Sequence, residues 1–249
     1  MEDILKHINQ FEATGLGEMN AIKLLNRQDT KYIFHQRQLP DILDDLCASY
    51  KMLEIDGVRL SAYQNIYFDT KDFTCYNMHQ RGMLNRTKVR IRTYVESDLS
   101  FIEIKTKTNK SRTIKKRISL NKGENFHSGR IKTFVDANSP FLADDLTQEI
   151  HIDFERLTLA HKDLKDRCTL DLNLRATWNG ETHHFDKLVI AELKQDRFKH
   201  SSPFNLALKK HKVYAESFSK YCFSFLELND QLKRNNFKPK LQHLYKTLL

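Results

Sequence analysis

Basic residues occupy every second position of one segment, where Lys88, Arg90 and Arg92 alternate with Val89 and Ile91. Two following segments repeat the pattern, the first with Glu103, Lys105 and Lys107 and the second with Lys115 and Arg117. Alternate side chains of a β-strand point to opposite faces, so each segment would carry one charged face and one apolar face. Arginine favours paired hydrogen bonds to phosphate or carboxylate. The spacing therefore predicts strands whose charged face binds a phosphate-rich anion.

Two segments in the second half of the chain show the same alternation. Arg167, Thr169 and Asp171 alternate with apolar residues, and so do Glu192 and Lys194. On the cationic face, Glu103 and Glu192 would repel phosphate directly. They make sense if they hold a divalent cation that bridges to the phosphates, because carboxylate oxygens are ligands for Mg²⁺ and Mn²⁺. We therefore take Glu192 and Glu103 as candidate metal ligands.

Closing such strands into a barrel with the charged face inward would line a tunnel with cations. A barrel of about eight strands leaves an interior that can hold one small ligand. Two like unit charges 4 Å apart repel by about 4 kcal/mol at an effective dielectric of 20. Many facing cations therefore require bound anions, acidic neighbours and water, and a linear phosphate chain would suit them. For any one strand, an ordinary sheet with one solvated face remains the alternative.

The composition agrees with an anionic partner without choosing it. The chain has 249 residues, 41 Lys+Arg against 32 Asp+Glu, and a net charge of +9. This balance suits nucleic acid, a membrane surface or phosphorylated small molecules. The four cysteines are far apart, as expected for reduced thiols in a cytosolic protein, and we see neither a secretory signal nor an apolar run long enough to span a bilayer. We expect a cytoplasmic protein.

The elements that must position these residues follow from periodicity and turn signals. We expect one domain over 1–249, with a short N-terminal helix at about 1–20, a helix opened by Pro40, and C-terminal helices at about 222–249. Strands are predicted over 24–34, 63–68, 88–94, 101–107, 114–120, 149–159, 168–177 and 184–193, with a hairpin turn at Asn179-Gly180. Helix is expected over 71–83, from 204 onward, and in short pieces within 121–147. Asp69-Thr70 is predicted to cap the helix that follows it.

Eight short motifs, in order, resemble the catalytic domain of the vacuolar transporter chaperone (VTC) polyphosphate polymerases. They are RQDTKY at 27–32, YFDT at 67–70, KVRIR at 88–92, EIK at 103–105, FER at 154–156, DRCTLD at 166–171, AELK at 191–194 and SKY at 219–221. The match spans about 24–226. It implies an α+β fold: the antiparallel eight-stranded β-barrel of triphosphate tunnel metalloenzymes, flanked by helices. It also implies a polymerase that passes the terminal phosphate of ATP to growing polyphosphate, with Mn²⁺ or Mg²⁺ required.

The resemblance also implies roles for individual residues. Phosphates would be held by Lys31, Arg90, Arg92, Lys105, Arg156, Arg167 and Lys220, joined by Lys115 or Arg117, while Glu192 would hold the metal. The strand pattern adds Lys88 and Lys194 to the phosphate-binding set and Glu103 to the candidate metal ligands. Because phosphoryl transfer depends mainly on positioning and charge neutralisation, we expect Arg90, Arg92, Arg156 and Arg167 to carry the catalysis.

The sequence departs from the wider tunnel superfamily, which opens with a Glu-x-Glu-x-Lys pattern. Arg27 and Asp29 stand at the two acidic positions, which fits a polymerase better than a hydrolase. Phe154 stands where a tyrosine is expected, so one phosphate or nucleotide hydrogen bond would be missing. Moving product across a membrane would need a separate membrane subunit.

Two other functions remain open. A triphosphatase of the same fold would use water as the acceptor, and would need a positioned water and more acidic residues. A non-enzymatic module would bind polyphosphate or nucleic acid. Tyr94 and Phe101 could stack on bases, as in sequence-tolerant nucleic-acid binders. Glu103 and Glu192 on the cationic face argue against nucleic acid and for ATP, pyrophosphate or polyphosphate with a metal.

Overall fold

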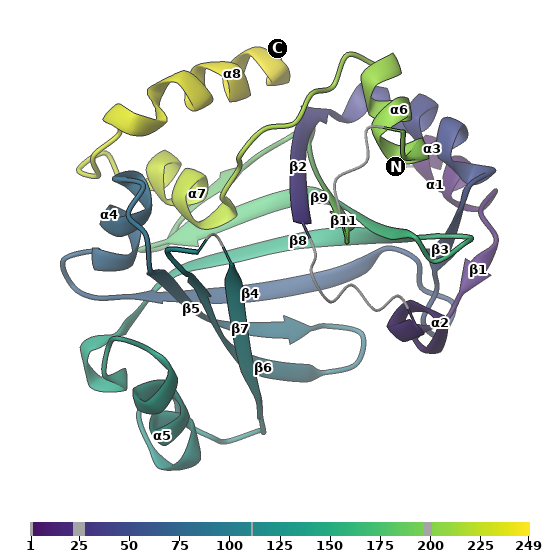
Figure 1. The fold of residues 1–249 in the computed structure, drawn as a ribbon. Helices are drawn as coiled ribbons and strands as arrows, with labels where there is room; N and C mark the ends of the chain where they lie inside the picture. The colour runs from purple at the N-terminus through teal and green to yellow at the C-terminus, as the bar shows by residue number, and fades with distance from the viewer. Residues whose placement is uncertain (1, 22–27, 111, 197–200) are drawn as a thin grey trace.

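The computed structural model describes residues 2–21, 28–110, 112–196 and 201–249, and its centre is one curled antiparallel sheet (Figure 1). Eight strands follow one another across it in the order β2-β11-β9-β8-β4-β5-β6-β7. Their bounds are β2 Gln28–His35, β4 Ser61–Asp69, β5 Arg86–Tyr94, β6 Leu99–Lys107, β7 Thr113–Leu120, β8 Thr147–His161, β9 Asp166–Trp178 and β11 Leu188–Gln195. The predicted α+β class with eight antiparallel strands is confirmed.

The sheet does not close into the expected barrel. Within the described residues, β2 and β7 are the two ends of the strand order and do not pair with each other. A later segment of the chain that contains Ala215 and Glu216 lies along the free edge of β2. Tyr32 forms a β-bridge with Ala215, and the Glu216 N–H donates to the Lys31 carbonyl at 2.8 Å. This pairing occupies part of the free edge of β2, and the tunnel is approximated by a curled, open sheet.

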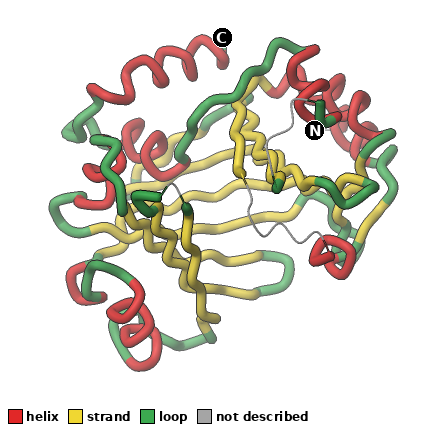
Figure 2. Tube along the Cα trace, in the orientation of Figure 1, coloured by secondary structure: helices red, strands yellow, loops and turns green. Residues whose placement is uncertain are grey.

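Helices cover the outer, apolar face of the sheet in two places (Figure 2). On the β2-β11-β9-β8 side, α1 Glu2–Ile8, α3 Leu39–Cys47 and α6 Pro203–Lys210 join a core whose strand residues are the apolar partners of the predicted charged positions, among them Leu170, Val189 and Leu193. On the other side, α5 Gly129–Asn138 packs over β6 and β7. Burial of these alternate positions fixes the face to which the charges point, because a one-residue slip would reverse it.

One helix packs on the inner face as well. The helix α7 Lys220–Leu228 belongs to a core cluster with Tyr67 of β4, Ile152 of β8 and Ile190 of β11. In Figure 1 it lies beside α4 Thr74–Gln80, with α8 Lys238–Leu248 beyond it. The inner face is therefore apolar under α7 and charged beside the first turn of α7. Ser219 caps the first turn of α7 by accepting from the Cys222 N–H, which sets Lys220 at this boundary.

Several boundaries differ from the sequence expectation. The predicted N-terminal helix is α1, the two-residue strand β1 Ala13–Thr14 and α2 Leu16–Ala21. The predicted strand over 184–193 is divided into β10 Glu181–His184 and β11 by a turn in which Lys187 takes a positive φ of 65°. The short strand β3 Tyr50–Leu53, which pairs with β8, was not predicted. Part of the strand expected over 24–34, including Arg27, lies outside the described residues.

Two local predictions are confirmed. The Asn179-Gly180 turn joins β9 to β10, with φ values of 48° and 83° that glycine and asparagine tolerate best. Asp69 accepts from the Thr70, Cys75 and Tyr76 N–H groups at the start of α4 and from the Tyr221 hydroxyl of α7. It is therefore a buried cap that joins two helices. None of the helices in the described parts of the chain is long and apolar enough to cross a membrane.

Candidate active site

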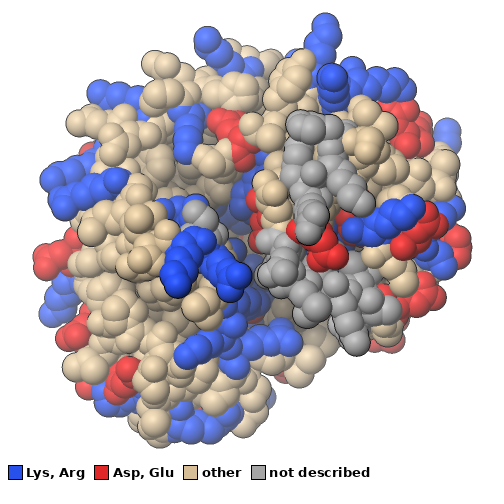
Figure 3. Space-filling model, viewed as in Figure 1, with Lys and Arg blue, Asp and Glu red and all other residues tan. Residues whose placement is uncertain are grey.

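The basic residues predicted from the strand pattern meet on the inner face of the sheet, where the molecule is hollowed (Figure 3). We call this region the basic groove. Its cations are Lys31 of β2, Lys88, Arg90 and Arg92 of β5, Lys105 of β6, Lys115 and Arg117 of β7, Arg156 of β8, Arg167 of β9, Lys194 of β11 and Lys220 of α7. The pairing register places Lys105 between Lys88 and Lys115, and Lys194 beside Arg167. The fold thus brings every predicted phosphate ligand to one face.

Glu103 lies between two of these cations. Arg90 donates to its Oε2 through Nε at 2.9 Å and Nη2 at 2.7 Å, and the Lys115 ammonium pairs with its Oε1. The Arg90 Nη1 also donates to the Tyr67 hydroxyl at 2.9 Å. Burial alone would raise the pKa of Glu103, but Arg90, Arg92 and Lys115 together lower it to about 2. Arg90 is therefore held in one orientation by an ionised carboxylate that is only 1% exposed.

Asp171 has the same relation to a second pair of cations. Arg156 donates to its two oxygens through Nε at 2.5 Å and Nη2 at 2.8 Å, and Lys220 reaches it from the start of α7. Burial opposes ionisation, yet Arg156 and Lys220 hold the pKa of Asp171 below its ordinary value. Asp171 had no predicted role. Its position on the cationic face of β9 was visible in the sequence, but its partners come from another strand and a distant helix.

Glu192 forms the third such group, with Lys31 of β2 at 2.5 Å and Lys194 of its own strand at 2.7 Å. These two lysines outweigh the effect of burial and keep the pKa of Glu192 well below its usual value. Unlike Glu103, its side chain is 15% exposed. The charges of Glu192, Lys31 and Asp29 also act on the pKa of Lys105 on β6. The two ends of the curled sheet therefore face each other across the groove.

Further polar and aromatic side chains fix the remaining cations. Arg92 donates through Nε to Asn65 at 2.9 Å and lies over the Tyr63 ring at 5.3 Å. Lys88 donates to Ser219 at 2.8 Å. Sequence reasoning did not assign roles to Tyr67, Asn65 or Ser219. The first two lie at alternate positions of β4, a period-two signal that their uncharged types concealed.

Several lysines of the groove have pKa values well below that of a free lysine but remain mainly charged at pH 7. Burial lowers the pKa values of Lys115 and Lys220 to about 8, although Glu103 and Asp171 oppose the shift. Burial also lowers the pKa of Lys105 to about 8. A bound anion would favour the charged form of each lysine. The groove is therefore built to gain stability from a polyanion.

The exposure and partners of Glu192 and Glu103 show which of these carboxylates could bind the predicted divalent metal ion. Glu192 is the more exposed of the two candidates, and a magnesium-type ion commonly needs only one or two carboxylates when substrate phosphates supply other ligands. Glu192 therefore fits a divalent cation that displaces a lysine contact. Glu103 is closed off by Arg90 and Lys115. Over the described ranges, no group of three or more His, Cys, Asp and Glu is placed to hold a metal by itself. The metal assignments of Glu192 and Glu103 stay predictions.

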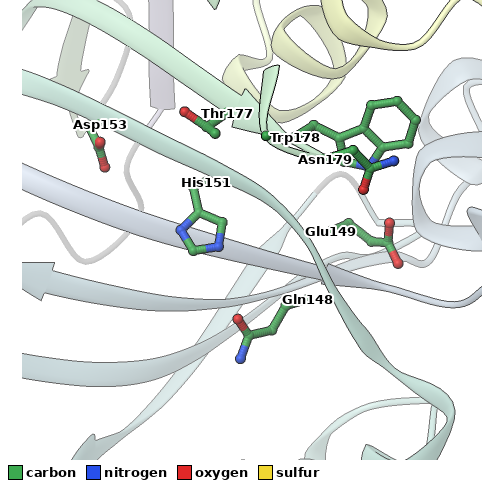
Figure 4. A pocket seen from close by; sticks show the side chains of 8 residues that line it. Gln148, Glu149, His151, Asp153, Thr177, Trp178 and Asn179 are labelled. Carbon is green, nitrogen blue, oxygen red and sulfur yellow. The ribbon is translucent and has the colours of Figure 1, made fainter. Parts of the chain in front are cut away.

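A separate pocket of about 400 Å³ lies on the outer side of β8 and β9 (Figure 4). Its lining includes Glu149, His151 and Asp153, which alternate with the inward-facing positions of β8, and Trp178 at the end of β9. Asp153 is paired with Arg175 at 2.7 Å. None of the predicted phosphate ligands lines this pocket, so it is distinct from the basic groove.

Comparison with known proteins agrees with this geometry. The family model described as the VTC domain matches residues 26–229. No curated protein matches the sequence. Among solved structures, a candidate adenylate cyclase from Bacillus halodurans has a TM-score of 0.53 and 14% sequence identity, covering 78% of this chain and 96% of that chain. A candidate adenylyl cyclase from Hippeastrum, described by its dominant triphosphatase activity, has a TM-score of 0.47 and 12% identity, covering 80% and 95%.

The Bacillus halodurans structure shows a common fold at an identity too low to carry function. The family match extends further, because it runs from before Lys31 to beyond Lys220 and so includes every strand that lines the groove. The chain belongs to the VTC domain family and has the fold of the triphosphate tunnel proteins.

Proposed function

We propose that this protein is a polyphosphate polymerase that transfers the terminal phosphate of ATP to a growing inorganic polyphosphate chain. Family membership supports a function on triphosphate or polyphosphate. The observation that carries the finer proposal is the pairing of Glu103, Asp171 and Glu192 with two cations each. This arrangement holds many cations in place and leaves these three carboxylates poor bases.

The arginines are suited to position the reacting phosphates. Arg90 and Arg156 each use two nitrogens on a carboxylate, so their guanidinium planes are fixed before substrate binds. Arg92 is fixed by Asn65. With Arg167, they would hold the transferring and leaving phosphates in line and offset the charge that develops in the transition state. Lysines on both sides would hold the rest of the chain.

The acceptor is the point at which a polymerase and a hydrolase differ. Water must lose a proton as it attacks, so a hydrolase benefits from a carboxylate able to accept one. The lowered pKa values of Glu103, Asp171 and Glu192 make them unsuited to this task. The end of a polyphosphate chain is already an oxyanion and needs no base. This favours phosphate over water as the acceptor.

A divalent ion, Mn²⁺ or Mg²⁺, would be held by Glu192 together with substrate phosphate oxygens. When bound, it would neutralise charge on the bridging oxygens. The chain's own residues would bind and align the phosphates around it. We expect the protein to act in the cytoplasm, and a separate membrane subunit would be needed if the product is exported.

The test is ³¹P NMR of the purified protein with ATP and Mn²⁺, seeded with pyrophosphate. Growth of an internal-phosphate resonance together with ADP is the expected result. Release of free phosphate without chain growth would support the triphosphatase alternative. Absence of turnover, with polyphosphate still bound, would support a non-enzymatic binding module and contradict the polymerase.

A further inference from the structure

A row of aromatic side chains crosses the inner face of four neighbouring strands at one end of the basic groove. Phe154 of β8 stacks on Tyr63 of β4, with ring centroids 5.3 Å apart and planes 5° from parallel. Tyr63 contacts Tyr94 of β5 at 5.1 Å, and Tyr94 meets Phe101 of β6 edge-on at 5.9 Å. The row therefore runs continuously from the wall near Arg156 to the wall near Arg117.

The two ends of this row differ in burial. Phe154 is only 3% exposed, whereas Tyr94 and Phe101 remain partly accessible. Leu99, which pairs directly with Tyr94 at the β5–β6 turn, is 54% exposed. The groove thus ends in an accessible surface of two rings and a leucine. An inorganic phosphate chain has no apolar surface to bury there, so this end fits a ligand that carries more than phosphate.

The cations at this end lie against the rings. The Arg117 guanidinium carbon is 4.7 Å from the Phe101 centroid, and that of Arg92 is 5.3 Å from the Tyr63 centroid. A guanidinium on an aromatic ring offers a flat, cationic platform on which a nucleobase can stack. From the aromatic end, β5 presents Arg92, Arg90 and Lys88 in that order, at intervals of about 7 Å. A phosphate chain attached to a stacked nucleoside would meet these cations in turn.

We propose that Tyr94, Phe101 and Arg117 form a subsite for the nucleobase of a nucleoside triphosphate. The nucleotide enters at the β5–β6 turn with its phosphates directed along β5 toward Lys88. This inference rests on the proposed function in one respect only, that the groove binds phosphates. It adds the residues that distinguish a nucleotide from an inorganic triphosphate, and the end of the groove at which the nucleotide lies.

The test compares two ligands of similar charge, inorganic tripolyphosphate and the non-transferable β,γ-imido analogue of ATP. Binding is measured by calorimetry on the wild type and on Phe101→Ala, Tyr94→Ala and Leu206→Ala. Leu206 is a control of similar type, 53% exposed on α6. Loss of base stacking should weaken nucleotide binding about tenfold in Phe101→Ala and Tyr94→Ala, since stacking contributes ~1–3 kcal/mol per base. Tripolyphosphate should bind each variant within about twofold of the wild type.

Saturation-transfer NMR gives a direct second measurement, because the adenine H2 and H8 protons should receive saturation from the wild type and lose it in Phe101→Ala. Equal weakening of both ligands would mean that the rings only support the groove, and would overturn the proposal. Unchanged binding of both would overturn it as well. These outcomes do not depend on turnover, so the nucleobase subsite can fail while the polymerase stands, or stand while the polymerase fails.

Discussion

Two walls of the basic groove each pair one carboxylate with cations, but they use different side chains. The arginine wall lies on β5, β6 and β7 and comprises Arg90, Arg92 and Arg117 with Glu103. The lysine wall lies on β2 and β11 and comprises Lys31 and Lys194 with Glu192. Glu103 is 1% exposed and is held by a two-nitrogen arginine contact and one ammonium, whereas Glu192 is 15% exposed and is held by two ammonium groups alone.

The difference shows how one groove can combine guanidinium groups held in a fixed orientation with ammonium groups whose contacts can be exchanged. A guanidinium is planar and holds its partner in a defined orientation, while an ammonium is a point charge on a flexible stem. The arginine wall therefore suits the positioning of reacting phosphates. The lysine wall can give up a contact to Glu192 when another cation arrives. Substitutions and titrations whose expected effects decrease in size test this contrast.

The largest effect is expected for Arg90→Ala. Loss of a fixed guanidinium that faces the phosphates should reduce transfer about 100- to 1000-fold, the range seen when a preorganised transition-state donor is removed. Chain growth followed by ³¹P NMR measures it, and circular dichroism melting checks that the fold persists. Arg90→Lys is the matched control, which keeps the charge but cannot make the two-nitrogen contact. Wild-type turnover in Arg90→Ala would remove the arginine wall from the mechanism.

Glu192→Gln should come next, with transfer about 10- to 100-fold slower and a higher divalent-ion concentration needed for half-maximal rate. Glu103→Gln should instead lower the free energy of unfolding, by about 3 kcal/mol, because Arg90 and Lys115 lose the buried counter-charge that they share. Metal titrations and thermal melts of both variants separate the two roles. If both variants shifted the metal dependence equally, the assigned contrast between the walls would be wrong.

A smaller effect is expected from pH. Lys105, Lys115 and Lys220 have pKa values of about 8, so each loses its positive charge as pH rises through that value. Tripolyphosphate affinity should therefore be high at pH 7 and fall several-fold by pH 9. Calorimetric titrations across this range measure it, and Lys105→Arg should flatten the profile because arginine stays charged. An affinity that rises with pH would contradict the role of these lysines.

The smallest effect is expected for Tyr67→Phe, which removes the hydroxyl that accepts from Arg90 Nη1. Loss of one hydrogen bond of about 1 kcal/mol should slow transfer several-fold, with little change in fold. Tyr76→Phe is the control, because the Tyr76 hydroxyl donates to the Lys233 carbonyl, away from the groove. Equal rates in the two variants would show that Glu103 alone orients Arg90.

The strands of the arginine wall could be read from the sequence, whereas their partners could not. Alternation over Lys88–Arg92 fixes which side chains share a face, since that pattern is local. It cannot reveal that Arg156 shares Asp171 with Lys220, because those residues come from two strands and a helix separated by long stretches of chain. Lys220 entered the prediction only through the family resemblance. The β10–β11 break was missed because Lys187 adopts a positive φ without glycine or asparagine to signal it.

The edge strand β7 links phosphate binding to solubility. Within the described residues β7 pairs only with β6, so one row of its backbone N–H and C=O groups is free to pair with another molecule. This strand carries three consecutive cations, with Lys115 and Arg117 on the groove face and Lys116 on the opposite face, where it donates to Asn138. Clustered like charges discourage edge-to-edge association of strands. Neutralising these charges would therefore promote aggregation of folded molecules. An activity assay alone would not distinguish this aggregation from a loss of catalysis.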